Sequence, residues 1–268
     1  MDDAQFSQLL SDLGNEAAAL LDVLRNLEPE QWQIPTPAEG WNIHDQVVHL
    51  AYFDDLVGLG FTDPDGFETK AAELEASGED WVDRLSHDRS AIPPTELVDW
   101  FSTSRASAID RFAQLGPSAR TPWFGPSMSA ASSATARLME TWAHGQDIYD
   151  ALSVHPDATD RIRHICHLGV ITRGFSYRVR GAEPPPAEVR VELTAPDESL
   201  WTWGAETLPD RVVGTASDFA LVVTQRRNIA DTSLAATPGA AAEWMTMAQA
   251  FAGSPGTGRP AGQFATTE

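Results

Sequence analysis

The sequence predicts a two-domain α+β protein, in which a four-helix bundle is followed by a small α+β domain. Over the first 155 residues, apolar side chains recur at helical spacing in four long segments separated by loops. Behind three consecutive prolines at 184–186 the pattern changes to short stretches of alternating apolar and polar residues. We therefore expect a bundle domain over 1–158, an α+β domain over 159–252 and a flexible tail over 253–268.

Each bundle helix is predicted from apolar residues three and four positions apart, together with its capping residues. Asn42 has the side chain of a helix N-cap, and Asp45 follows at the spacing of a capping-box partner. Residues 62–94 are less regular than the rest. The predicted elements are, in order, a helix over 3–27, a helix over 42–60, one or two helices within 65–87, a helix capped by Thr95 and ending near 115, a loop over 116–128 and a helix over 129–152.

The second half mixes helix and strand patterns. Alternation at 189–194 is the clearest strand signal, since one face of a strand is buried there. The expected elements are, in order, one helix over 160–181, strands near 189–194, 200–204 and 211–215, a helix over 219–226 capped by Ser217 or Asp218, a strand within 232–237 and a helix over 240–251.

Charge and cysteine content limit the function classes. The net charge is −21, which argues against nucleic acid or an anionic membrane as partner, because both need a basic surface. Cys166 is the single cysteine, so an intramolecular disulfide and a CxxC motif are both excluded. The acidic start resembles no secretory signal, and no apolar run is long enough for a membrane helix. We expect a cytoplasmic monomer or homodimer that acts on a small molecule.

The helix over 129–152 has a polar stripe beside its apolar face. Arg137, Glu140, His144 and Asp147 fall within an arc of about 80° at 100° per residue. Glu140 and His144 are thus one turn apart at the edge of a surface that must pack inward. A carboxylate and an imidazole in this arrangement supply two of the three protein ligands of a typical catalytic metal site.

His49, in the middle of the second helix, is the candidate for the third ligand. Two histidines and one carboxylate leave coordination positions open, which is typical of catalytic rather than structural sites. Zn²⁺ suits these ligands best, with Ni²⁺, Fe²⁺ or Mn²⁺ as alternatives. Asp45 or Asp147 would orient a histidine by a hydrogen bond to the ring nitrogen that does not bind the metal. Two simpler interpretations stay open: a hydrogen-bonded core histidine at His49, and a surface ion pair between Glu140 and His144.

His164 and His167 form a second histidine pair near Cys166. The two histidines share a helical face, but the cysteine points away from it. An ordinary helix with incidental histidines is the favoured interpretation, and a second metal site is the alternative.

The segment from Trp41 to His49-Leu50-Ala51, together with the stripe from Arg137 to Asp147, resembles the mycothiol-dependent maleylpyruvate isomerase family. That family belongs to the DinB-like metal-binding bundles. The resemblance covers about 5–155 and implies a DinB-like four-helix bundle with His49, Glu140 and His144 as metal ligands. More weakly, the second half is similar to the family's sterol-carrier-like domain. There 219–228 fits an arginine-bearing helix, which implies a catalytic role for Arg226 or Arg227.

The resemblance implies a thiol-dependent isomerase or S-transferase. The metal would bind a low-molecular-weight thiol such as mycothiol and favour its thiolate, which then adds to a small electrophilic substrate. Arg226 or Arg227 would pair with a substrate carboxylate, or else form a surface salt bridge. Asp147 would orient His144 or a bound water, or else form an ion pair or a cap. A metal-dependent hydrolase and a non-catalytic protein that binds a metal or a small ligand are the alternatives.

Overall fold

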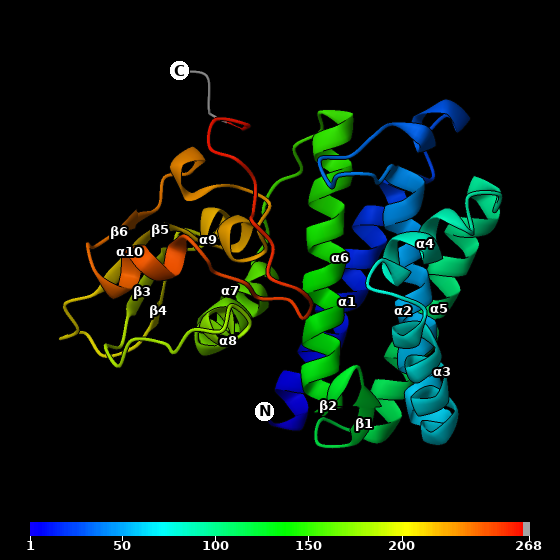
Figure 1. Cartoon of the computed structure of the whole chain (residues 1–268), viewed down its shortest axis with the longest axis horizontal. Helices are drawn as coiled ribbons and strands as arrows, with labels where there is room; N and C mark the ends of the chain where they lie inside the picture. Colours follow the sequence, from blue (N-terminus) through cyan, green and yellow to red (C-terminus); the bar gives the residue numbers. More distant parts are fainter. Residues whose placement is uncertain (265–268) are drawn as a thin grey trace. The chain divides into compact units, whose positions relative to one another are not determined.

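The computed structural model describes residues 1–264 of the 268-residue chain. The chain divides into two compact units, Met1–Pro156 and Asp157–Glu268, and each is described by itself (Figure 1). Within the described residues, no helix is both long and apolar enough to cross a membrane.

Four long helices form the first unit: α1 (Asp3–Leu24), α2 (Ile43–Thr62), α5 (Pro94–Leu115) and α6 (Ala130–Leu152). They run alongside one another, with α2 packed on α5 and α6, and α1 packed on the same two helices (Figure 1). Apolar faces meet in a shared core, as the helical spacing requires. The buried residues of this core include Leu20, Leu21, Leu24, Ile43, Val47, Val48, Leu50, Leu97, Phe101 and Ile148. The predicted four-helix bundle is confirmed.

The helix starts follow from their capping residues. Asn42 and Asp45 form the predicted capping box, in which each side chain accepts a hydrogen bond from the other's backbone N–H (2.9 and 3.0 Å). Ser129 is the N-cap of α6 and accepts from the Ser132 amide at 3.1 Å. Helix α5 begins at Pro94, two residues before the start expected after a Thr95 cap, because proline is well suited to the first helical turn.

Short elements fill the connections of the bundle. They are η1 (Pro29–Gln33), α3 (Pro64–Ala76), α4 (Trp81–His87), β1 (Arg120–Trp123) and β2 (Gly125–Ser129). The two helices α3 and α4 agree with the prediction for 65–87. The predicted loop over 116–128 is wrong: it contains a two-stranded antiparallel hairpin that turns at Phe124 and at Gly125, whose φ is +92°. Pro122 and Pro126 hide these strands in the sequence, since proline is rare in paired strands.

A four-stranded sheet lies in the second unit, in the order β4-β3-β5-β6. Strand β3 is parallel to β5 and antiparallel to β4, and β5 is antiparallel to β6. Helix α9 packs on this sheet and on α7. The elements are α7 (Ile162–Ile171), α8 (Arg173–Arg178), β3 (Arg190–Thr194), β4 (Leu200–Trp203), β5 (Arg211–Thr215), α9 (Ala216–Val223), η2 (Ile229–Asp231), β6 (Ala235–Ala236) and α10 (Ala240–Met245).

Three helix boundaries of the second unit differ from the prediction. The single helix expected over 160–181 is broken at Thr172, whose hydroxyl donates to the Leu168 carbonyl at 2.8 Å. Helix α9 is capped by Thr215 rather than by Ser217 or Asp218, and it ends before Thr224. Helix α10 ends six residues before the expected end at Phe251.

The segment expected to be a flexible tail, 253–268, lies partly outside the described residues, which end at 264. Within them, Arg180 donates to the Gly256 carbonyl at 2.9 Å, and Asn228 donates to the Arg259 carbonyl at 3.1 Å. Residues 253–264 are therefore hydrogen bonded to the rest of the second unit. The flexibility of the tail stays a prediction.

Candidate metal site

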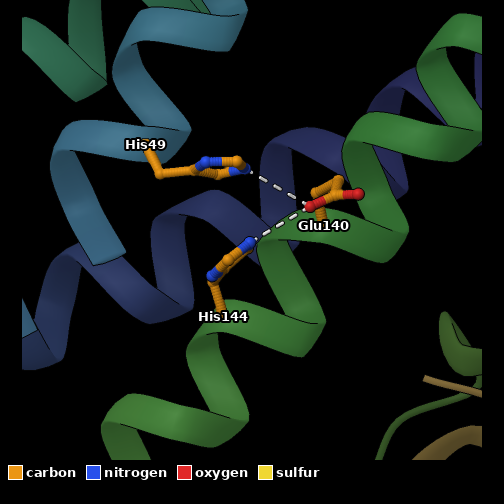
Figure 2. A group of neighbouring side chains, drawn as sticks. All are labelled: His49, Glu140 and His144. Carbon is orange, nitrogen blue, oxygen red and sulfur yellow. Dashed lines mark hydrogen bonds and ion pairs between the residues drawn. The ribbon is translucent and has the colours of Figure 1, made fainter. Parts of the chain in front are cut away.

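His49, Glu140 and His144 converge where α2 packs on α6 (Figure 2). Helix α2 supplies His49, and consecutive turns of α6 supply Glu140 and His144, because residues four apart share a helix face. Nε2 of His144 lies 3.1 Å from Oε2 of Glu140, and Nε2 of His49 lies 3.5 Å from the same oxygen. One ligand atom from each residue lies within 4.8 Å of the others. The stripe on α6 and the histidine on α2 thus form one cluster, hereafter the triad.

Gln46 orients His144 through a short chain of hydrogen bonds. The Gln46 amide donates to the Thr36 hydroxyl at 2.8 Å, and that hydroxyl donates to the Trp41 carbonyl at 2.9 Å. The amide oxygen of Gln46 therefore faces His144, and Nδ1 of His144 donates to it. Since Nδ1 carries the proton in a neutral imidazole, the lone pair of Nε2 points at Glu140.

Burial sets the charge of the triad. Burial and the neighbouring His144 lower the pKa of His49 to about 4, so its imidazole is neutral at neutral pH. Burial alone would raise the pKa of Glu140, but the contacts with both histidines and the charge of Arg137 hold it well below its usual value. At neutral pH His49 is thus a neutral imidazole beside the Glu140 carboxylate, and metal binding needs both groups in these protonation states.

Aromatic rings surround the two histidines. The Trp41 ring stacks on His144 with centroids 5.9 Å apart, and the Phe53 ring lies 4.4 Å from His49. The Glu140 side chain keeps 17% of its surface exposed, so the ligands are accessible from one side. This arrangement combines a small polar cluster with an apolar wall, which is typical of sites that bind small molecules.

Comparison with known proteins identifies the family. The sequence profile of the mycothiol maleylpyruvate isomerase N-terminal domain matches residues 13–149, which include all three residues of the triad. The chain belongs to this family. An uncharacterized protein of Mycobacterium tuberculosis, Rv0036c in strain H37Rv and MT0041 in strain CDC 1551, is 40% identical over 250 residues. That match covers 93% of this chain and 97% of the relative.

Two solved structures share the fold. A crystal structure of a mutant of the mycothiol-dependent maleylpyruvate isomerase superposes with a TM-score of 0.60 at 13% identity, and one of the mycothiol-dependent maleylpyruvate isomerase with 0.58 at 14%. Each match covers 87% of this chain and 93% of the other. The predicted two-domain α+β fold is therefore confirmed, and so is the resemblance to this family. The similarity of the second unit to a sterol-carrier domain stays a prediction.

The two carboxylates expected to orient the histidines have different outcomes. Asp45 caps α2 through the Asn42 amide, and within residues 1–264 Nδ1 of His49 has no hydrogen-bond partner. The role predicted for Asp45 at His49 is therefore wrong. Asp147 is fully buried one turn after His144. Its predicted orienting or catalytic role stays a prediction.

Gln46 is the residue of the site that sequence reasoning missed. It lies one turn before His49 on α2 and is fully buried. A buried amide beside the apolar Val47 and Val48 was the available signal. The orienting group was expected to be a carboxylate, but an amide oxygen accepts the same hydrogen bond from a histidine N–H.

Arg226 and Arg227 lie in the second unit, in the turn behind α9 rather than on the helix. The Arg226 guanidinium donates to the Thr224 carbonyl at 2.7 Å. Arg227 lies over the Phe264 ring, with Cζ 3.8 Å from the centroid, and lines a cavity of about 100 Å³. The structure brings the triad together within the first unit, and the catalytic role of these arginines stays a prediction.

The second histidine pair has no metal-site geometry. His167 accepts from the Trp203 indole at 3.2 Å, and Cys166 is buried, which raises the pKa of its thiol. In the part of the chain that the structure describes, the triad is the only group of three or more His, Cys, Asp or Glu residues close enough to share a metal ion. The interpretation as an ordinary helix is the better one.

Proposed function

We propose that the chain binds a divalent metal ion at His49, Glu140 and His144, and uses it with a low-molecular-weight thiol such as mycothiol. The reaction is the isomerisation of a small electrophilic substrate or the transfer of the thiol to it. Family membership supports the thiol-dependent, isomerase-like class. The observation that carries the metal is the lone pair of His144, which Gln46 directs at the Glu140 carboxylate.

The donor set fits a divalent cation. With the proton on Nδ1, the Nε2 lone pair of His144 and the Glu140 carboxylate oxygen, 3.1 Å apart, are two donor atoms close enough to hold one cation. Two imidazoles and one carboxylate leave further positions for water, thiol or substrate, and they suit Zn²⁺, with Ni²⁺ or another divalent ion as alternatives. The neutral state of His49 agrees with this role, because a protonated imidazole cannot act as a ligand.

A bound metal would supply thiolate at neutral pH by lowering the pKa of its thiol ligand. The residues of the chain then hold and surround the reacting groups. Gln46 fixes the ring of His144, and Trp41 and Phe53 keep water from two sides of the triad. Arg226 or Arg227 is proposed to pair with a carboxylate of the substrate.

Metal analysis of the purified full-length protein tests this function. We expect about one equivalent of zinc or another divalent metal, and its loss in His49→Ala and in His144→Ala. His164→Ala is the matched control, since it removes a histidine of the other pair, and it should keep the metal. Full metal content in both triad variants would show that the ligands are wrong.

Thiol dependence separates this function from its alternatives. With maleylpyruvate as the test substrate, turnover should require both the metal and an added low-molecular-weight thiol. Turnover without thiol would favour a metal-dependent hydrolase, and binding without turnover would favour a non-catalytic protein. The cavity of about 100 Å³ in the second unit is well below the ~300 Å³ at which ligand pockets begin, so it does not favour an apolar-ligand carrier.

The remaining parts of the proposal concern partners and location. The substrate is a small molecule, and the net charge of −21 disfavours nucleic acid and anionic membranes as partners. The proposed location is the cytoplasm. The proposed oligomeric state is a monomer or a homodimer, and light scattering would distinguish the two.

A further inference from the structure

Arg137 is a buried arginine on the same stripe of α6 as the triad. It lies one turn before Glu140, and 5% of its surface is exposed. Its guanidinium carbon is 5.6 Å from the centroid of the Phe53 ring and 5.7 Å from that of Trp123. The positive charge thus lies against two adjacent aromatic rings, whose centroids are 6.2 Å apart, beside the proposed metal ligands.

The guanidinium of Arg137 contains a buried donor that is unsatisfied within the described residues. Among residues 1–264, its Nη1 atom is buried without a hydrogen-bond partner. Two carboxylates act on its charge, but Glu140 faces both histidines, and Asp54 accepts from Arg105 at 2.7 and 3.1 Å. Burying a cation without its own partner is costly, so such a residue calls for an explanation beyond packing.

The charge of the site points to an anionic ligand. A divalent metal with two imidazole ligands and one carboxylate ligand would carry about one positive charge, and Arg137 adds a second. One anionic ligand, the thiolate, balances the metal. A second anion next to Arg137 would balance the guanidinium and supply the acceptor that Nη1 lacks.

The aromatic wall continues from Arg137 to the triad. Phe53 contacts both groups, because its ring centroid lies 4.4 Å from that of His49 and 5.6 Å from the guanidinium carbon of Arg137. Trp123, Phe124 and Trp81 extend the wall, with ring centroids 5.2 to 6.2 Å from their neighbours. An anion held by Arg137 would therefore have its uncharged part against flat apolar rings, next to the proposed metal ligands.

We propose that Arg137 binds the carboxylate of a small organic acid, whose planar apolar part packs against Phe53 and Trp123. This deepens the proposed function and rests on it, since it names a further residue that would hold a carboxylate of the substrate and orient the substrate at the triad. A carboxylate accepts two parallel hydrogen bonds from a guanidinium, which fixes the direction of the rest of the molecule.

Arg105 provides the matched comparison for a purely structural arginine. It is equally buried, but it is bound to Asp54 by two hydrogen bonds and to the Thr141 hydroxyl at 2.8 Å. Arg105→Met leaves the buried Asp54 carboxylate without its ion-pair partner and should lower the Tm. Arg137→Met removes a buried cation whose Nη1 has no hydrogen-bond partner among residues 1–264, and it should leave the Tm unchanged or raise it. A clear fall in Tm for Arg137→Met would overturn the assignment, because it would reveal a structural role.

Calorimetric titration of the full-length protein with benzoate and benzamide tests the anion itself. The two probes share the planar ring and differ in charge. We expect benzoate to bind at least about tenfold more tightly than benzamide, with and without zinc, and Arg137→Met to lose that preference. Arg137→Lys should keep part of it, since the charge remains. Zinc content should be unchanged in both variants.

The outcomes separate this proposal from the metal function. Equal benzoate affinity in the wild type and Arg137→Met would overturn the role of Arg137. Benzoate binding that appears only with zinc and ignores Arg137 would also overturn it, because the metal would then hold the carboxylate. Benzoate binding that needs Arg137 in a protein unable to bind any metal would support the role of Arg137 and contradict the metal function alone.

Discussion

Gln46 determines which nitrogen of His144 faces Glu140. Its amide oxygen holds the proton on Nδ1, so Nε2 is free to act as a ligand. We predict that Gln46→Leu weakens zinc binding about 10- to 100-fold, as is usual when the partner of a ligating histidine is removed. Competition with a chromophoric chelator measures this affinity. Gln8→Leu, at an exposed position of α1, is the control. Equal zinc affinity in Gln46→Leu and the wild type would contradict the orienting role.

His49 makes the metal-free protein sensitive to acid. Burial lowers its pKa to about 4, whereas the unfolded chain titrates near 6.5, so the unfolded state binds the proton first. The stabilising effect is complete above pH 6.5 and is lost as the pH falls toward 4, by about 3 kcal/mol. Glu140 acts in the same direction, since its depressed pKa adds stability that is lost below its usual range.

Urea unfolding with chelator present, between pH 7.5 and 4, measures this dependence. We predict that the free energy of unfolding declines less steeply in His49→Ala than in the wild type below pH 6.5. The variant starts from a lower stability, because it leaves a cavity beside Phe53, so the slopes are compared rather than the values. Parallel slopes would show that His49 is not buried in its neutral form.

At this scale the sequence predicts ligand types better than their surroundings. The spacing of Glu140 and His144, with His49 on a second helix, was enough to propose the triad. The partner of His144 was not predictable, because a single amide such as Gln46 leaves no periodic signal. Arg137 was placed on the correct stripe, but its contact with the Trp123 ring depends on a hairpin that the sequence did not reveal.

The β1–β2 hairpin is the element that covers α2 and α3. Its Trp123 stacks on Phe67 of α3 with centroids 5.7 Å apart, and it is also one of the rings around Arg137. The contact is tight at Gly60 of α2, where an added Cβ would lie 2.5 Å from the Thr121 hydroxyl and 3.4 Å from the Pro122 carbonyl. Gly60 therefore permits the close approach of the hairpin to the helix.

Two glycines of α2 test this contact against helix propensity. Gly60→Ala should push the hairpin away and destabilise the protein by about 1–3 kcal/mol. Gly58→Ala meets nothing within 4 Å and should stabilise it by up to about 1 kcal/mol, because alanine is the better helix former. Denaturant unfolding of both variants gives the two values. A Gly60→Ala variant as stable as Gly58→Ala would mean that the hairpin does not need the close approach.

Helix boundaries were predictable where a side chain defines them. The Asn42–Asp45 box and the Ser129 cap are local signals, and both lie where expected. The break at Thr172 was not predictable from apolar spacing, since Val170 and Phe175 continue the pattern on either side of it. The early end of α9 was not predictable either, because no glycine or proline follows Val223 closely. Tertiary contacts decide such ends, as the hydrogen bond from the Ala250 amide to the Val223 carbonyl illustrates.

For the whole molecule, the change from helical apolar spacing to alternating apolar and polar residues predicted two domains. The structure divides the chain into two units at 156/157. All three proposed metal ligands and Arg137 lie in the first unit, together with the buried core of its bundle. The family match over 13–149 falls within the same unit. The proposed metal centre is therefore complete without the second unit, whereas the proposed catalytic arginines, Arg226 and Arg227, belong to that unit.

A chain ending at residue 156 should separate metal binding from turnover. Because each unit has its own core, we predict that the shortened chain folds and binds zinc within about threefold of the full-length affinity. It should have no thiol-dependent turnover of maleylpyruvate, because Arg226 and Arg227 are missing.

In the full-length protein, Arg226→Ala with Arg227→Ala should keep the zinc and lower kcat/KM about 10- to 100-fold, as expected when a charged contact to substrate is lost. Loss of zinc from the shortened, folded chain would show that the second unit contributes to the metal site, and turnover by that chain would remove the arginines from the mechanism.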